Sequence, residues 1–145
     1  MGAGELCADI GGVFGEGELM ILRLPFPDSK LFPNAKNGKS WKVSHAAKVS
    51  AREYAYTAAK QAQAGFTDKG GAIPVSIVFC QPDKRRRDLD NMLAAMKSAL
   101  DGVAEALGVD DKRFRPITID AGPVDKAGAV LVAVGVEIVQ LTGDV

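Results

Sequence analysis

The sequence predicts a single α+β domain in which two helices pack on a mixed sheet of about four strands. Two long segments, residues 44–64 and 89–107, place apolar side chains at helical spacing. Four shorter segments have the composition of strands, at residues 20–25, 75–80, 116–121 and 129–139. With 145 residues, of which 47% are hydrophobic, the chain is long enough to bury one core. The predicted order is strand, helix, strand, helix, strand, strand.

The first strand follows a glycine-rich stretch. Glycine loses much conformational entropy on ordering, so we expect residues 1–19 to be a loose arm and residues 20–145 to form the domain. Met20 stands directly before the strand pattern and is a candidate natural start. Leu22 and Leu24 alternate with other residues, and two prolines then end the run.

The second strand and the second helix have the clearest patterns. Both faces of residues 75–80 are apolar, which predicts a central strand. Apolar residues then recur at i, i+3, i+4 and i+7 from Leu89 to Leu107, which predicts one helix with a buried stripe. Asp88 suits the N-cap of this helix and Gly108 its C-terminal end. The last two strands flank a turn at residues 125–128, and we predict a hairpin.

Composition excludes several classes of protein. The formal net charge is zero, so any nucleic-acid binding has to come from local patches. Cys7 and Cys80 lie far apart and lack the spacing of a zinc site, and we expect reduced thiols in the cytoplasm. No apolar run is long enough to cross a membrane, and no glycine-rich phosphate loop of the nucleotide-binding type occurs.

The most informative stretch runs from Arg85 to Asn91, where three arginines precede two aspartates at the start of a helix pattern. If Asp88 is extended at the N-cap and Asp90 lies in the first turn, both carboxylates can face one cation. The alternative is that Asp88 only caps the helix and Asp90 offsets its dipole. The basic run itself is either a solvated loop or a grip on phosphates.

Further candidates surround this stretch. Lysines in the polar loop at residues 28–43 could contact DNA beside Trp41, together with a later arginine: Lys36, Lys39, Lys42 and Arg113. The basic run contributes Lys84, Arg85, Arg86 and Arg87. His45, the single histidine, is expected to be an ordinary helix residue.

Asp111 and Lys97 complete the candidate set. Asp110 and Asp111 form either a turn or part of a metal site. Lys97 returns to nearly the same helix face as Asp90, where it either contacts a phosphate or pairs with Asp101 one turn later.

Three groups of residues, taken in order, resemble the RusA family of Holliday junction resolvases. They are Pro82 to Asn91, Leu100-Asp101-Gly102, and Leu107 to Asp111. The Leu24-Pro25-Phe26-Pro27 start, Pro33-Asn34 and the last two strands also resemble the forms carried by phages and prophages. The resemblance spans about residues 22–139.

This resemblance implies a RusA-like fold and a homodimeric endodeoxyribonuclease of DNA recombination and repair, in a bacterium or a phage-infected host cell. Such enzymes use Mg²⁺ to cut four-way DNA junctions by paired nicks. Asp88, Asp90 and Asp111 match the three essential aspartates of the family. Many relatives have a functional lysine where this chain has Ala94, and Lys97 is a candidate replacement. The alternative is a non-catalytic dimer that binds branched DNA.

Simple geometry predicts that the site is shared between two chains. The helix from Asp90 to Leu107 would be about 26 Å long, whereas the residues from Gly108 to Asp111 reach back at most about 14 Å. We therefore predict that Asp111 of one chain meets Asp88 and Asp90 of its partner across a two-fold axis. A stripe of small residues could allow the two helices to approach, namely Ala95, Ala99, Gly102 and Ala106. The alternative is a helix broken at Gly102, which would let one chain double back.

Overall fold

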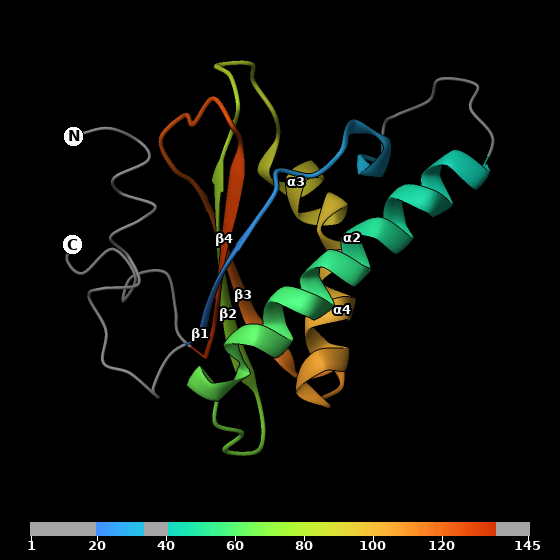
Figure 1. Ribbon diagram of the computed structural model, residues 1–145. Helices are drawn as coiled ribbons and strands as arrows, with labels where there is room; N and C mark the ends of the chain where they lie inside the picture. The colour runs from blue at the N-terminus through green and yellow to red at the C-terminus, as the bar shows by residue number, and fades with distance from the viewer. Residues whose placement is uncertain (1–19, 34–40, 136–145) are drawn as a thin grey trace.

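The computed structural model describes residues 20–33 and 41–135 and confirms a single small α+β domain (Figure 1). Its strands are β1 (Met20–Leu24), β2 (Ile73–Cys80), β3 (Phe114–Ala121) and β4 (Ala129–Val134). Its helices are α2 (Trp41–Ala62), α3 (Leu89–Ala95) and α4 (Lys97–Leu107). Short 3₁₀ turns occur at Ser29–Leu31, Gln63–Gly65 and Asp111–Arg113. The predicted arm at residues 1–19 and the last residues of the predicted fourth strand lie outside the described ranges.

The four strands form one mixed sheet, and the three helices cover one of its faces (Figure 1). The strand order is β1-β4-β2-β3, with β4 antiparallel to both of its neighbours and β2 parallel to β3. Strands β1, β2 and β3 therefore run in the same direction. The carboxyl ends of these three strands therefore lie at the same end of the sheet, and the segments that follow them lie close together.

The predicted hairpin of the last two strands is wrong, because β3 and β4 lie on opposite sides of β2. All six residues of β4 are buried, which suits an interior strand, whereas most residues of β3 are exposed or half-buried. Pro116 lacks an N–H donor and is tolerated on β3 because this strand is at the edge. The predicted turn is present, with the amide of Gly128 donating to the carbonyl of Asp125 at 2.6 Å.

Strand β2 is an interior strand with both faces buried apart from Pro74, as its composition predicts. Its side chains Val75, Ile77 and Phe79 join apolar residues of β1, β4 and the helices in one core. Burial of this core is the main source of stability, at about 25 cal/mol for each Å² of apolar surface. None of the helices in the described ranges combines the length and apolarity that a membrane span requires.

The predicted helix at residues 89–107 is divided at Met96 into α3 and α4, so the sheet carries three helices rather than two. The last turn of α3 tightens, and the amide of Met96 donates to the carbonyl of Leu93 at 2.9 Å. Both segments bury the same apolar stripe, so the spacing of apolar residues does not reveal the break. The alternative break at Gly102 is also wrong, because this residue lies inside α4.

The stripe of small residues packs against α2 of the same chain and does not serve as the predicted contact between two chains. Ala99, Gly102 and Ala106 are buried, and α2 and α4 are in close contact. A Cβ atom added to Gly102 would overlap the carbonyl oxygen of Arg52 and lie 3.2 Å from the amide of Tyr56. Gly102 therefore allows the backbones of α2 and α4 to approach each other.

Candidate functional site

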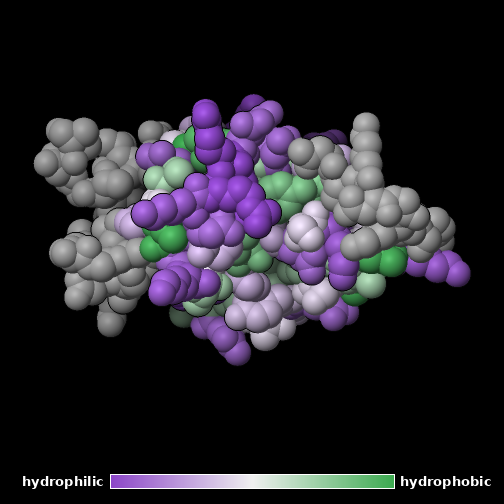
Figure 2. Space-filling model, turned by 90° about the horizontal axis from the view of Figure 1, so that it is seen from above, coloured by the Kyte–Doolittle hydropathy of each residue, from purple (hydrophilic) through white to green (hydrophobic). Residues whose placement is uncertain are grey.

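The candidate site lies at the end of the sheet where the carboxyl ends of β1, β2 and β3 are found. Three segments meet there, at residues 25–33, 81–88 and 122–128. The amide of Gly122 donates to the carbonyl of Phe79 at 2.9 Å, and that of Asp125 donates to the carbonyl of Gln81 at 2.8 Å. These bonds hold the segment after β3 against the segment after β2. Seen from above, hydrophilic side chains gather over this end of the molecule (Figure 2).

Asp83 organises the turn that carries the predicted basic run. One of its oxygens accepts from the amide of Arg85 at 2.9 Å and from the guanidinium of Arg87 at 2.9 Å. Arg87 also donates to Gln81 at 2.8 Å and lies 5.1 Å from the centre of the Phe26 ring. The hydrogen bond from Arg87 lowers the pKa of the Asp83 carboxyl, so the pair remains charged at neutral pH.

The basic run therefore divides into one internal arginine and three outward-facing cations. The Arg87 side chain is only 16% exposed, because it contacts both Asp83 of the turn and the Phe26 ring of the segment after β1. Lys84, Arg85 and Arg86 are exposed, and the Arg85 guanidinium is 4.0 Å from Asp83. These three side chains can reach a phosphate without losing an internal contact of comparable strength.

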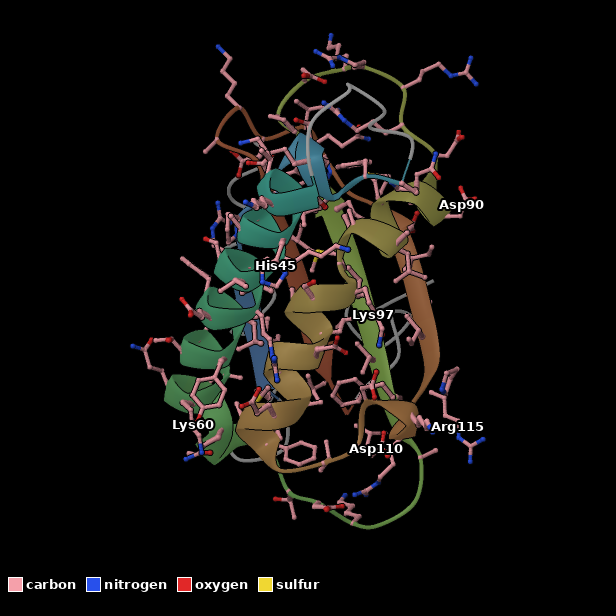
Figure 3. The ribbon with its side chains drawn as sticks, turned by 90° about the vertical axis from the view of Figure 1, so that its right-hand side faces the viewer. His45, Lys60, Asp90, Lys97, Asp110 and Arg115 are labelled. Atoms are coloured by element: carbon pink, nitrogen blue, oxygen red, sulfur yellow. The ribbon has the colours of Figure 1, made fainter. Side chains whose placement is uncertain are left out.

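Asp88 has the extended backbone predicted for the N-cap of α3, with φ −74° and ψ 136°, but its side chain makes no capping hydrogen bond. Asp88 is thus the N-cap residue, as predicted, but its carboxylate is not used to cap the helix. Asp90 lies in the first turn and is exposed (Figure 3). Neither carboxylate forms an ion pair within the described ranges. Both offer hard oxygen donors of the kind that Mg²⁺ prefers.

Asp88 and the arginines line a common groove of about 680 Å³. One wall is the segment after β1, with Pro25, Phe26 and Phe32. The other wall contains the three arginines and continues to Asp88 and Asn91 at the start of α3. The groove thus combines apolar and aromatic surface with cations and one carboxylate, which suits a strand of nucleic acid.

Lys97 bridges two aspartates at the other end of the candidate set. Its ammonium donates to Asp111 at 2.5 Å and to Asp101 at 2.9 Å, so it makes the predicted contact with Asp101 and a second one as well. Asp111 first and Asp101 second raise the pKa of Lys97, and Lys97 lowers the pKa of Asp111. Lys97 is therefore ion-paired with Asp111 within one chain.

Asp111 does not join Asp88 and Asp90 within one chain. Figure 3 shows Asp90 and Asp110 at opposite ends of the α3 and α4 pair, with Lys97 between them. Within residues 20–33 and 41–135, no three acidic, histidine or cysteine side chains lie close enough together to hold a metal ion. Division of the helix at Met96 does not bring the chain back far enough to complete the site alone.

Arg113, a predicted DNA contact, is engaged within the domain. Its guanidinium donates to Asp68 at 2.6 and 3.2 Å and to the carbonyl of Gly71 at 2.9 Å. The contact lowers the pKa of Asp68 to about 2 and raises that of Arg113. Arg113 thus fastens the loop before β2 to the start of β3.

The remaining candidates lie on or before α2. Lys42 and His45 are exposed residues of this helix, and His45 is a helix residue as predicted. Lys36 and Lys39 fall outside the described residues. The contacts of Asp83 and Phe26 with Arg87 were missed by the sequence analysis. The spacing of four residues between Asp83 and Arg87 was a signal for the first, but nothing local indicates the second.

One similar protein provides a comparison. A protein of Xylella fastidiosa (strain Temecula1), named only as uncharacterized, is 36% identical over 126 residues, which cover 83% of this chain and 78% of that protein. No profile of a known protein family matches the chain.

Proposed function

The chain belongs to the same family as the Xylella fastidiosa protein, and we propose that it is a Mg²⁺-dependent endodeoxyribonuclease of the RusA type that resolves four-way DNA junctions. One observation carries the proposal. A carboxylate that the helix does not use for capping, Asp88, opens onto a groove lined by Arg85, Arg86 and Arg87. Metal-dependent cleavage of a phosphodiester uses carboxylates that bind the metal and cations that bind the phosphate.

The residues that line the groove, together with Lys84 and Asp90 beside them in the sequence, have different roles. Lys84, Arg85 and Arg86 bind and position the DNA backbone, while Arg87 keeps the turn in place. Asp88 and Asp90 would hold Mg²⁺, which when bound orients water for in-line attack and offsets charge on the leaving oxygen. Asn91 lines the same groove and is placed to orient the backbone of the bound strand.

Asp111 of a second chain would complete the metal site. Within one chain, Asp111 is held by Lys97, away from Asp90. In a dimer with two-fold symmetry, each Asp111 would lie beside the Asp88 and Asp90 pair of its partner, with Lys97 next to the reacting phosphate. Two equivalent sites suit a junction, because it presents two equivalent strands. The contact between chains must use surfaces other than the small-residue stripe, because its residues are buried within one chain and Gly102 packs against α2.

The decisive experiment is cleavage of a labelled four-way junction with and without Mg²⁺. We expect paired nicks that require the metal and are abolished in Asp88→Asn and Asp90→Asn. Binding of the junction without nicking at any Mg²⁺ concentration would contradict the nuclease proposal. It would favour the non-catalytic DNA-binding dimer, which the exposed Ala94 on α3 supports.

A mixed dimer tests the shared site. One chain carries Asp88→Asn and the other Asp111→Asn, with different affinity tags so that the heterodimer can be purified. Shared sites leave one intact site in each heterodimer, so we expect a single nick per junction rather than a pair. Both mutant homodimers should be inactive. A heterodimer as inactive as the homodimers would show that each site belongs to one chain.

A further inference from the structure

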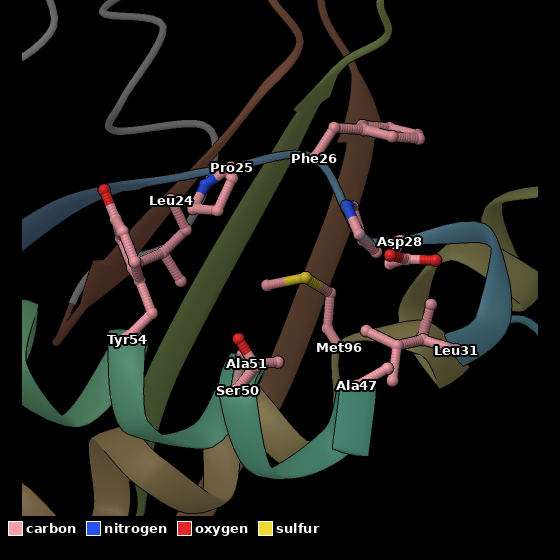
Figure 4. Close-up of a pocket in the computed structure, with 13 residues that line it drawn as sticks. Leu24, Pro25, Phe26, Asp28, Leu31, Ala47, Ser50, Ala51, Tyr54 and Met96 are labelled. Atoms are coloured by element: carbon pink, nitrogen blue, oxygen red, sulfur yellow. The ribbon is translucent and has the colours of Figure 1, made fainter. Parts of the chain in front are cut away.

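A second cavity lies directly behind the arginine-lined groove, and we propose that it receives one unpaired nucleobase of the bound DNA. The cavity has a volume of about 310 Å³ and lies between α2, the α3 and α4 junction and the segment after β1 (Figure 4). We call it the base pocket. This inference rests on the proposed function, because it assumes that DNA lies in the groove.

The lining of the base pocket suits a flat, largely apolar group. Leu24, Leu31 and Met96 are among its apolar lining residues, and the lining residues Ala47, Ser50 and Ala51 of α2 have small side chains. In Figure 4, Met96 projects between α2 and the segment after β1. The pocket is near the lower limit of ligand sites, which is about 300 Å³, so it fits one heterocycle rather than a larger molecule.

Tyr54 stands at one end of the pocket with an unusually exposed ring. It is 55% exposed, although large aromatic side chains are usually covered in a folded domain. Figure 4 shows the ring rising from α2 toward Leu24 and Pro25. An exposed aromatic face at the mouth of an apolar cavity is suited to stacking on a base.

The groove carries the positive charge that binds a phosphate, whereas the base pocket lacks the positive charge that would attract a phosphate in place of a base. Three arginines line the groove, whereas among the described residues no lysine or arginine lines the base pocket. The charged side chain of the pocket is Asp28, which would repel a phosphate. One Asp28 oxygen already accepts from the amide of Lys30 at 2.9 Å. The other oxygen of Asp28 and the hydroxyl of Ser50 are acceptors for the amino and imino groups of a base.

A short wall separates the two cavities. Pro25, Phe26 and Pro27 line both of them. The Phe26 ring points away from the base pocket in Figure 4 and lies under the guanidinium of Arg87. A backbone held by Arg85 and Arg86 could therefore pass along one side of the wall while its base occupies the other side.

The occupant must be a base that is already unpaired or easily opened. Removing a base from a stacked duplex costs a few kcal/mol, and this cost is lowest where pairing is already lost. At the crossover of a four-way junction the stack of bases is interrupted, so a base there opens more easily than one inside a continuous duplex. The base pocket would then help to select branched DNA over duplex DNA.

The test compares two junctions that differ in one base. Each has one extra nucleotide at the crossover, which is an ordinary nucleotide in the first and an abasic analogue in the second. Affinities are measured by fluorescence anisotropy without divalent metal, so that cleavage does not enter. We expect the full-length protein to bind the first junction about 5-fold or more tightly than the second.

Two neighbouring alanines of α2 provide matched variants. Ala47 lines the base pocket, whereas Ala46 is exposed and does not. Ala47→Trp should bring the ratio of the two affinities close to one and leave binding of the abasic junction unchanged. Ala46→Trp should keep the ratio of the unsubstituted protein. Tyr54→Ala, which adds no volume, should also lower the ratio and serves if Ala47→Trp does not fold.

The outcomes separate the pocket from the proposed function. Tight binding of both junctions with equal affinity would overturn the base pocket and leave the nuclease proposal standing. The same holds if Ala47→Trp and Tyr54→Ala, both folded by circular dichroism, retain the full ratio. Failure of the unsubstituted protein to bind either junction would overturn both proposals.

Discussion

Residues of the same type in the basic run have different roles, and the difference follows from their contacts. Arg87 makes hydrogen bonds with Asp83 and Gln81 and covers the Phe26 ring, so most of its side chain is removed from solvent. Arg86, its neighbour, is exposed. A guanidinium with its donors already satisfied has little left for a phosphate, whereas an exposed one keeps its full capacity.

Substitution of these two arginines should separate DNA binding from stability. Arg86→Ala should weaken binding of any DNA and reduce the slope of log affinity against log salt by about one. Its melting temperature should be unchanged. Arg87→Ala should lower the melting temperature by several degrees, because it releases Asp83 and uncovers Phe26. Anisotropy titrations at several salt concentrations and thermal melts measure both effects, and identical behaviour of the two variants would contradict the assignment.

For the proposed nuclease, Lys97 is the residue whose substitution tests the chemistry most directly. Its raised pKa, caused mainly by Asp111, keeps it positively charged at neutral pH. Lys97→Ala should lower junction cleavage by about 100-fold, which is typical for the loss of one group that stabilises the transition state. Binding without metal should change little. Lys112→Ala, at an exposed neighbour of Asp111, is the control. Near-normal cleavage by Lys97→Ala would remove Lys97 from the mechanism.

At the scale of the elements, helix packing depends on one glycine. Helices α2 and α4 lie together on the sheet, and Gly102 allows the backbone of Arg52 to come close. An ion pair between Arg52 and Glu105 lies at the surface of the same contact. Exposed pairs of this kind contribute about 0–1 kcal/mol, so close backbone packing matters more than charge here.

Gly102→Ala should destabilise the protein even though alanine is the better helix former. In an open helix this change would stabilise by about 1 kcal/mol. Here the added methyl group would overlap Arg52, and overpacking costs about 1–3 kcal/mol. Urea denaturation measures the difference. Ser98→Ala in the same helix is the control and should be slightly stabilising, by no more than about 0.5 kcal/mol, because alanine is the better helix former. A more stable Gly102→Ala would show that the helices can separate without cost.

The whole molecule has its candidate site at one end of the sheet and an ion pair at the other. Asp68 and Arg113 join the loop before β2 to the start of β3. Because the pKa of Asp68 is lowered from 3.8 to about 2 in the folded protein, its contribution to stability is full above about pH 4. The contribution is lost as pH falls toward 2, since the carboxyl then becomes protonated in both states.

Asp68→Asn should therefore lower the melting temperature at pH 7 by roughly one to three degrees. The difference from the unsubstituted protein should shrink between about pH 4 and pH 2. Thermal melts across this range measure it, with Asp120→Asn on the exposed edge strand as the control. A difference that does not depend on pH would mean that the pair acts through packing rather than through charge.

The sequence by itself determined the type and order of the main elements, because apolar spacing reports which residues face a core. It also indicated the ends of the second helix pattern, since Asp88 is extended and Gly108 has φ 71°. The candidate residues Asp88 and Asp90 and the exposed cations before them were recognisable as one contiguous run.

Only the tertiary structure decided how distant segments combine. Strand pairing placed β4 between β1 and β2, because a strand buried on every residue needs neighbours on both sides. The small-residue stripe packs against α2 through Gly102. Phe26, from the segment after β1, contacts the guanidinium of Arg87 and helps to cover it. The spacing of apolar residues along the chain predicts only the structure of a single helix or strand. These contacts form between segments that are far apart in the sequence and approach each other only when the core packs.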